Sequence, residues 1–199
     1  MNLPRVYPIV DNAEWIARLA PAGVRLVQLR IKAQPPIAVA AQIERARALC
    51  TAGGIQLVVN DHWQAALAAG CDFVHLGQED LQGADLGALR RAGVRLGIST
   101  HDEAELERAL AAAPDYVALG PVYHTTLKVM PWAPQGLARL GQWKRRIGAL
   151  PLVAIGGVTL ARLPQVFAAG ADVAAVVSDI LAAQDPATRA RQWLDVAAA

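Results

Sequence analysis

The chain has 199 residues, of which 54% are hydrophobic and 18% are charged, and its formal net charge at pH 7 is +2. This composition excludes intrinsic disorder, and the length predicts a single domain over residues 1–199. The charge is too weak, and the Lys and Arg residues are too scattered, for a nucleic-acid-binding surface, so no nucleic-acid partner is expected.

Short hydrophobic runs rich in β-branched residues recur along the whole chain, and amphipathic stretches lie between them. The runs cover residues 5–10, 26–30, 56–59, 73–76, 95–99, 116–119, 152–155 and 173–177. The clearest helical stretches are 36–51, 102–112 and 160–169. Near-continuous hydrophobic strands that alternate with amphipathic helices are typical of parallel strands buried on both faces. Eight such units predict a (β/α)₈ TIM barrel, with a doubly wound sheet as the alternative.

The sequence carries no sign of a membrane or an oxidising environment. The N-terminal segment MNLPRVYPIVD lacks the apolar core of a signal peptide, and the most apolar stretch, 166–183, is interrupted by Asp172 and Asp179. The two cysteines, Cys50 and Cys71, form no C-x-x-C pair and are expected to be small buried side chains. We therefore expect a cytoplasmic protein with no membrane partner.

Polar residues follow most of the predicted strands, at the carboxyl end or just beyond it. In a (β/α)₈ barrel these positions converge on one mouth, where such enzymes place their active sites. The sequence thus predicts one pocket. The residues are Gln28, Arg30, Lys32, Asn60, Asp61, His75, Gln78, Asp80, Ser99, His101, Thr125, Lys128, Gly156, Gly157 and Ser178.

The segment VQLRIK is interpreted as a strand, which places Gln28, Arg30 and Lys32 on one side of the sheet. Cations that point into a barrel are unfavourable unless they meet an anion, because an unpaired buried charge loses its hydration. These residues therefore predict an anion clamp. A solvent-exposed edge strand is the alternative.

Asp61 and Asp80 follow neighbouring predicted strands, so their carboxylates are expected to lie close together. One or two carboxylates, completed by water and substrate phosphates, suit Mg²⁺. Asn60 or Asp61 as the N-cap of the next helix, and ordinary loop polarity around Asp80, are the alternatives.

The next two loops offer further polar groups. Thr100 and Glu103 have the spacing of a capping box, while the role of Ser99 and His101 stays open. The connection 120–135 is longer than most loops in compact domains, which favours a binding loop in which Thr125 and Lys128 supply a hydroxyl and a cation.

The segments AIGG and VVSD follow the last two predicted strands, where TIM barrels commonly bind phosphate. Gly157 would let the backbone approach the ligand closely, with Ser178 beside it, although a tight turn alone also explains the glycines. Two anion sites at one mouth imply two phosphorylated ligands or one bisphosphate. No Ser-His-Asp arrangement or nucleophilic cysteine is evident. With Mg²⁺ and cations gathered at one anion, loss of a diphosphate leaving group is the expected chemistry.

In chain order, the segments QLRIK, VND, VHLGQEDL, GISTH, ALGPVY, PQG, AIGGV and AVVSDI, together with Thr125 and Lys128, span nearly the whole chain. This series resembles the thiamine phosphate synthase family. The resemblance implies a Mg²⁺-dependent TIM-barrel transferase, expected as a homodimer. Its reaction joins 4-amino-2-methyl-5-hydroxymethylpyrimidine diphosphate to a thiazole phosphate, or to the thiazole carboxylate phosphate, and releases thiamine phosphate and diphosphate.

The resemblance also implies residue roles. Gln28 and Asn60 would hold the pyrimidine, and Asp61 and Asp80 would carry Mg²⁺. The diphosphate would be bound by Arg30, Lys32, Ser99 and Lys128, of which Arg30, Ser99 and Lys128 are the expected catalytic residues. Thr125 and Val177 would contact substrate, and Gly157 and Ser178 would cradle the thiazole phosphate. In the implied dissociative mechanism diphosphate leaves first, and the thiazole nitrogen captures a methylene cation.

One loop departs from the family pattern. Where the family has T-x-T-K, this chain has Leu127 in place of the second Thr, and His124 stands where Pro is frequent. A lost hydroxyl beside the substrates removes a hydrogen bond, so lower activity is expected. Two alternatives remain: a thiazole tautomerase of the same fold, with His101 or His124 moving protons, and a non-catalytic phosphate-ligand binder.

Overall fold

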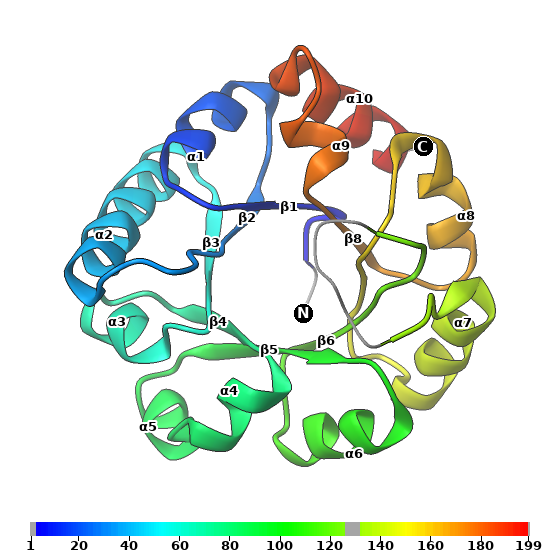
Figure 1. Ribbon diagram of the computed structural model, residues 1–199, viewed down its shortest axis with the longest axis horizontal. Helices are drawn as coiled ribbons and strands as arrows, with labels where there is room; N and C mark the ends of the chain where they lie inside the picture. The colour runs from blue at the N-terminus through cyan, green and yellow to red at the C-terminus, as the bar shows by residue number, and fades with distance from the viewer. Residues whose placement is uncertain (1–2, 126–131, 199) are drawn as a thin grey trace.

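The computed structural model describes residues 3–125 and 132–198. Eight parallel strands close into a barrel in the order β1 to β8, and helices form a ring around it (Figure 1). β1 closes the barrel by pairing with β8, with Val6 opposite Ala174. The predicted TIM barrel is therefore confirmed.

The strands lie within one or two residues of the predicted runs, because burial on both faces leaves each of them almost entirely hydrophobic. They are β1 (Val6–Val10), β2 (Leu26–Leu29), β3 (Gln56–Asn60), β4 (Phe73–Leu76), β5 (Arg95–Thr100), β6 (Tyr116–Leu119), β7 (Leu152–Ala154) and β8 (Val173–Val176).

The outer ring consists mostly of short helices. The α-helices are α1 (Glu14–Leu19), α2 (Pro36–Gly53), α3 (Trp63–Ala68), α4 (Gln78–Gly83), α5 (Leu86–Arg91), α6 (Glu103–Ala111), α7 (Gly136–Ile147), α8 (Leu163–Ala168), α9 (Ser178–Leu181) and α10 (Pro186–Ala198). Two 3₁₀ turns, η1 (Ala20–Ala22) and η2 (Leu160–Arg162), complete it. The predicted helix at 160–169 is thus divided into η2 and α8. Pro164 lies in the first turn of α8, where a backbone N–H has no partner within the helix, so the missing N–H of proline costs no hydrogen bond.

Two hydrophobic cores stabilise the barrel. The larger one lies between the strands and the helices. The smaller one fills the barrel interior and contains Tyr7, Leu26, Phe73, Tyr116 and Val173. Interior positions alternate along each strand, so the residues two positions further on, toward the carboxyl ends, face the mouth of the barrel.

The predicted capping box at Thr100 is wrong. Thr100 belongs to β5 and is fully buried, where its hydroxyl donates to the Ala118 carbonyl and accepts from the Trp143 indole. Asp102 is the N-cap of α6 instead, and its carboxylate accepts a hydrogen bond from the Glu105 N–H. β5 includes Thr100, so α6 begins at Glu103, two residues later than a cap at Thr100 would place its start.

Within the described ranges, no helix is long and apolar enough to cross a membrane. Cys50 and Cys71 are both buried free thiols, as expected from their isolated positions.

Candidate active site

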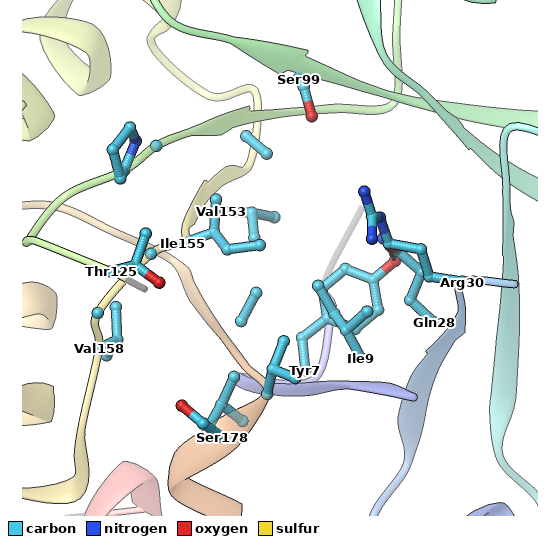
Figure 2. A pocket seen from close by; sticks show the side chains of 18 of the residues that line it. Tyr7, Ile9, Gln28, Arg30, Ser99, Thr125, Val153, Ile155, Val158 and Ser178 are labelled. Atoms are coloured by element: carbon cyan, nitrogen blue, oxygen red, sulfur yellow. Dashed lines mark hydrogen bonds between the residues drawn. The ribbon is translucent and has the colours of Figure 1, made fainter. Parts of the chain in front are cut away.

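A cavity of about 520 Å³ lies at the carboxyl ends of the strands. In Figure 2, Arg30 and Ser99 lie toward one end of this cavity and Ser178 and Thr125 toward the other, with Ile9, Val153 and Ile155 between them. Polar groups at two ends of an apolar chamber fit a ligand, or a pair of ligands, with separated anionic groups. The predicted mouth and site residues that line the cavity are Gln28, Arg30, Asn60, His75, Ser99, His101, Thr125, Gly156, Gly157, Val177 and Ser178.

The predicted anion clamp is formed only in part. β2 ends at Leu29, so the expected strand through Lys32 is wrong, and the Arg30 N–H still pairs with the Val10 carbonyl at 2.7 Å. Gln28 is 3% exposed, and both Gln28 and Arg30 line the cavity. Lys32 is exposed and does not belong to the cavity lining, because the chain leaves the barrel after the strand ends.

Asp61 and Asp80 do come together beside the cavity wall. Asp61 follows β3 with a positive φ of 62°, a conformation in which Asp is enriched, and it accepts a 2.5 Å hydrogen bond from the cavity-lining Asn60. Asp80 lies in the first turn of α4. Partial burial raises the pKa of the Asp80 carboxyl, and the charge of Asp61 and a hydrogen bond with it raise that pKa further. The two carboxylates are therefore direct neighbours.

These carboxylates fit a divalent cation. The described residues hold no cluster of three or more His, Cys, Asp or Glu side chains, but Mg²⁺ needs only one or two carboxylates when phosphates and water complete its shell. The N-cap alternative fails, since α3 is preceded by His62 and has no side-chain capping bond. A cation between Asp61 and Asp80 would relieve the repulsion that raises the Asp80 pKa.

A chain of side-chain hydrogen bonds crosses the floor of the cavity. The Gln28 amide nitrogen donates to the Tyr7 hydroxyl at 3.0 Å, and the Tyr7 and Tyr116 hydroxyls lie 3.0 Å apart. The Tyr116 hydroxyl is 2.7 Å from Nδ1 of His75, whose Nε2 is 2.8 Å from the Ser99 Oγ. Five residues from five strands are thus linked, and all five line the cavity.

The sequence did not reveal this chain. Tyr7 and Tyr116 have the appearance of core residues, and no role was assigned to His75. The available signal was the alternation along the strands, because Tyr7 lies two residues before Ile9 and Tyr116 two before Ala118, both on the inward face. A Ser-His pair is also present, contrary to expectation, but a tyrosine replaces the carboxylate of a catalytic triad.

The chain is uncharged. Burial, and to a smaller extent the positive charge of Arg30, lower the pKa of His75 from 6.5 to about 3. Burial also raises the pKa values of Tyr7 and Tyr116 above their usual range. A neutral hydrogen-bonded network therefore lies beside the Arg30 guanidinium in the cavity lining.

His101 occupies the rim. It lines the cavity, its Nδ1 pairs with the Glu105 carboxylate at 2.7 Å, and its ring stacks on Trp132 with centroids 5.5 Å apart. Trp132 is the first described residue after segment 126–131, so its stacking on His101 places the chain leaving that segment against the end of β5. Lys128 and Leu127 lie outside the described residues.

The far end of the cavity has the features of a phosphate site. Gly157 has a φ of 65°, and a Cβ atom there would lie 2.5 Å from the His124 carbonyl oxygen, so the position requires glycine. Ser178 begins α9, and Val177 alone separates it from the end of β8. The Asp179 carboxylate accepts a 2.6 Å bond from the Trp193 indole, which fixes α9 to α10.

The comparisons with known proteins agree with this geometry. A family model described as thiamine monophosphate synthase matches residues 6–180. The chain belongs to this family. It is 60% identical to thiamine-phosphate synthase of Rhizobium etli over 194 residues, which covers 98% of this chain and 95% of that protein. Its identity to thiamine-phosphate synthase of Escherichia coli O9:H4 is 50%, over 96% of this chain and 91% of that protein.

A solved structure of thiamine phosphate pyrophosphorylase from Pyrococcus furiosus superimposes with a TM-score of 0.86 at 25% identity, covering 99% of this chain and 96% of that one. Together with the family match, this confirms the resemblance read from the sequence motifs, and with it the predicted synthase function.

Proposed function

We propose that this member of the thiamine monophosphate synthase family condenses 4-amino-2-methyl-5-hydroxymethylpyrimidine diphosphate with a thiazole phosphate, giving thiamine phosphate and diphosphate with the help of Mg²⁺. The observation that carries the proposal is the single cavity. It joins Gln28, Arg30 and Ser99 at one end to the Gly157 and Ser178 phosphate site at the other, with a carboxylate pair beside it.

Gln28 and Asn60 bind the pyrimidine. Both are almost fully buried in the cavity wall, at 3% and 5% exposure. The Gln28 amide nitrogen is engaged by Tyr7, so its carbonyl oxygen is the amide atom that accepts a hydrogen bond from the pyrimidine amino group. This contact orients the ring whose amino group stabilises the cation formed when diphosphate leaves.

The diphosphate lies against Arg30 and Ser99, and Lys128, which lies outside the described residues, is kept as a diphosphate ligand on the family resemblance alone. Arg30 provides a planar guanidinium suited to two phosphate oxygens, and the Ser99 hydroxyl provides a further donor. Asp61 and Asp80 would hold Mg²⁺. When bound, the metal would supply positive charge to offset the charge of the leaving diphosphate.

The thiazole phosphate binds at Gly157, Val177 and Ser178, with Thr125 nearby in the cavity lining. The bond between the pyrimidine methylene carbon and the diphosphate oxygen breaks, and the electron pair leaves with diphosphate. The thiazole nitrogen then donates its lone pair to the methylene cation. This nitrogen carries no proton to lose, so the residues need to position and neutralise charge and need not supply a base.

The assay is thiamine phosphate formation from the two substrates with Mg²⁺, beside an EDTA control. Asp80→Asn is expected to lower the rate by at least tenfold, whereas Glu79→Gln, a neighbouring exposed acid of α4, serves as the matched control and should retain it. Product formation that EDTA leaves unchanged refutes the metal assignment.

Absence of product refutes the synthase. Conversion of a thiazole carboxylate phosphate tautomer by the same protein then favours the tautomerase, with the cavity-lining His101 or His124 as proton carriers. Tight binding of either substrate without any turnover favours the non-catalytic binder. We also expect a cytoplasmic homodimer. Sedimentation of the purified protein tests the oligomeric state.

A further inference from the structure

We propose that His75 is a positioning residue that acts through Ser99: its Nε2–H donates to the Ser99 Oγ, so that Ser99 directs its single proton toward the anion in the cavity. This inference rests on the proposed function for the identity of that anion, the diphosphate of the pyrimidine substrate. The proposal gives the buried hydrogen-bond chain a direction of donation, from the pyrimidine subsite to the diphosphate subsite. The chain is Gln28–Tyr7–Tyr116–His75–Ser99.

The direction follows from the donor inventory of the chain. At the first end, the amide nitrogen of Gln28 can only donate, so the Tyr7 hydroxyl oxygen accepts that hydrogen bond. The single hydroxyl proton of Tyr7 is then donated to the Tyr116 oxygen. Tyr116 in turn gives its proton to Nδ1 of His75. Since a neutral imidazole carries one N–H, the proton of His75 lies on Nε2, opposite the Ser99 Oγ.

The rigid surroundings of the ring hold this arrangement. His75 is 6% exposed, and Tyr116 stacks on it with the ring planes inclined by 13°. Asn60 on β3 and Gly97 on β5 are its partners in the two neighbouring strands. Arg30 is the charged group whose field reaches the ring, and a cation there disfavours a second proton on His75. Rotation of the imidazole would break both of its hydrogen bonds.

The direction decides what Ser99 can do. A hydroxyl has one proton and two lone pairs, so an Oγ that accepts from His75 keeps its proton for a ligand. In the opposite direction Ser99 would donate to His75 and present only lone pairs to the anion, which repels them. The same reasoning excludes His75 as a base for Ser99, because the nitrogen facing the hydroxyl is already protonated. The pair is therefore a directed donor and not a nucleophilic dyad.

The first test is the tautomer of His75, measured by ¹⁵N NMR of the full chain at neutral pH without substrates. The expected signature is a protonated Nε2 and an unprotonated Nδ1. Tyr116→Phe removes the donor to Nδ1 and is expected to change the tautomer population. Tyr123→Phe, which removes a buried hydroxyl with no hydrogen-bond partner among the described residues, is the matched control and should leave the signals unchanged. A protonated Nδ1 in the unsubstituted protein overturns the proposal.

The second test is a double-mutant cycle read out by binding of inorganic diphosphate with Mg²⁺, measured by calorimetry. Ser99→Ala is expected to weaken binding by about tenfold or more, as for a hydrogen bond to a charged group. His75→Phe should weaken it by roughly as much in the unsubstituted protein but by less than about twofold in the Ser99→Ala background, because coupled residues are not additive. His75→Gln, which retains an amide N–H toward Ser99, should restore most of the affinity.

Equal effects of His75→Phe in both backgrounds overturn the proposal, since they show that His75 acts independently of Ser99. If His75→Phe fails to fold, the cycle is run with His75→Gln and His75→Asn, and loss of affinity restricted to His75→Asn supports the proposal while equal loss overturns it. Neither readout needs turnover. A protein with the expected tautomer and coupling that forms no thiamine phosphate refutes the proposed function and leaves the Ser99 assignment intact.

Discussion

Gly97 on β5 is predicted to be indispensable for the hydrogen-bonded chain. It is the strand partner of both His75 and Tyr116, and the Tyr116 ring lies directly over it. A Cβ atom on Gly97 would be 2.1 Å from Cζ of Tyr116 and 2.5 Å from its hydroxyl oxygen. Contacting carbon atoms stay about 3.5 Å apart, so Gly97→Ala would displace the ring by roughly 1.4 Å.

The stability loss can be worked from that displacement. Overpacking of a core typically costs about 1–3 kcal/mol. The Tyr116 bonds to His75 and Tyr7, 2.7 and 3.0 Å long, would exceed hydrogen-bonding distance, at about 1 kcal/mol each. We expect the free energy of unfolding to fall by about 3–5 kcal/mol, which for a chain of this size lowers Tm by roughly 10 °C.

Urea and thermal unfolding measure this difference. Gly83→Ala is the matched control, because no atom lies within 4 Å of a Cβ built at the end of α4, and it should change stability by less than about 1 kcal/mol. A Gly97→Ala protein within about 1 kcal/mol of the unsubstituted one would refute the packing argument, since the ring would then have room to move.

Further predictions concern charge, metal and loop. The folded-state pKa of His75, about 3, lies below its ordinary value of 6.5. Its contribution to stability is therefore complete above pH 6.5 and is lost as the pH falls, by about 1.4 kcal/mol per pH unit. Between about pH 6.5 and 5, the free energy of unfolding should depend less on pH in His75→Gln than in the unsubstituted protein. Mg²⁺ titration should show weaker binding to Asp80→Asn than to the unsubstituted protein. Burial raises the pKa of Cys50 to about 12 and also raises that of Cys71, so a thiol reagent should label neither until the protein unfolds. Leu127→Thr should raise the synthase rate about twofold to tenfold, and an unchanged or lower rate contradicts the expected role of the missing hydroxyl.

The strands were predictable because burial on both faces makes each strand a continuous hydrophobic run in the sequence. Residues such as Val74 and Leu76 face the helices while Phe73 and His75 face the interior, so whole strands are hydrophobic and their ends are marked by polar residues. The meeting of Gln28, Arg30 and Ser99 at one cavity was predictable for a related reason, since the carboxyl ends of barrel strands converge on the mouth.

The errors and omissions arise where a position depends on the partner strand. Lys32 continues an alternating pattern, but nothing in the pattern shows that pairing stops at Leu29. Thr100 has cap chemistry, yet its hydroxyl is used by Trp143 of a helix 36 residues further on, counted from Thr100 to Gly136. Tyr7 and Tyr116 meet across the barrel, and only the closure of β1 on β8 brings their hydroxyls together.

The filled lower half of the barrel has a consequence for the order of events in catalysis. Leu26, Phe73 and Val173 are fully buried below the tyrosine pair, so a ligand in the cavity has its path to solvent at the mouth. Substrates and products must share that path. Bound diphosphate deep in the pocket would therefore obstruct the next pyrimidine substrate. Diphosphate should therefore inhibit the steady-state rate competitively with the pyrimidine diphosphate. Hydrolysis of the released diphosphate by another enzyme would lower its concentration and so favour product formation.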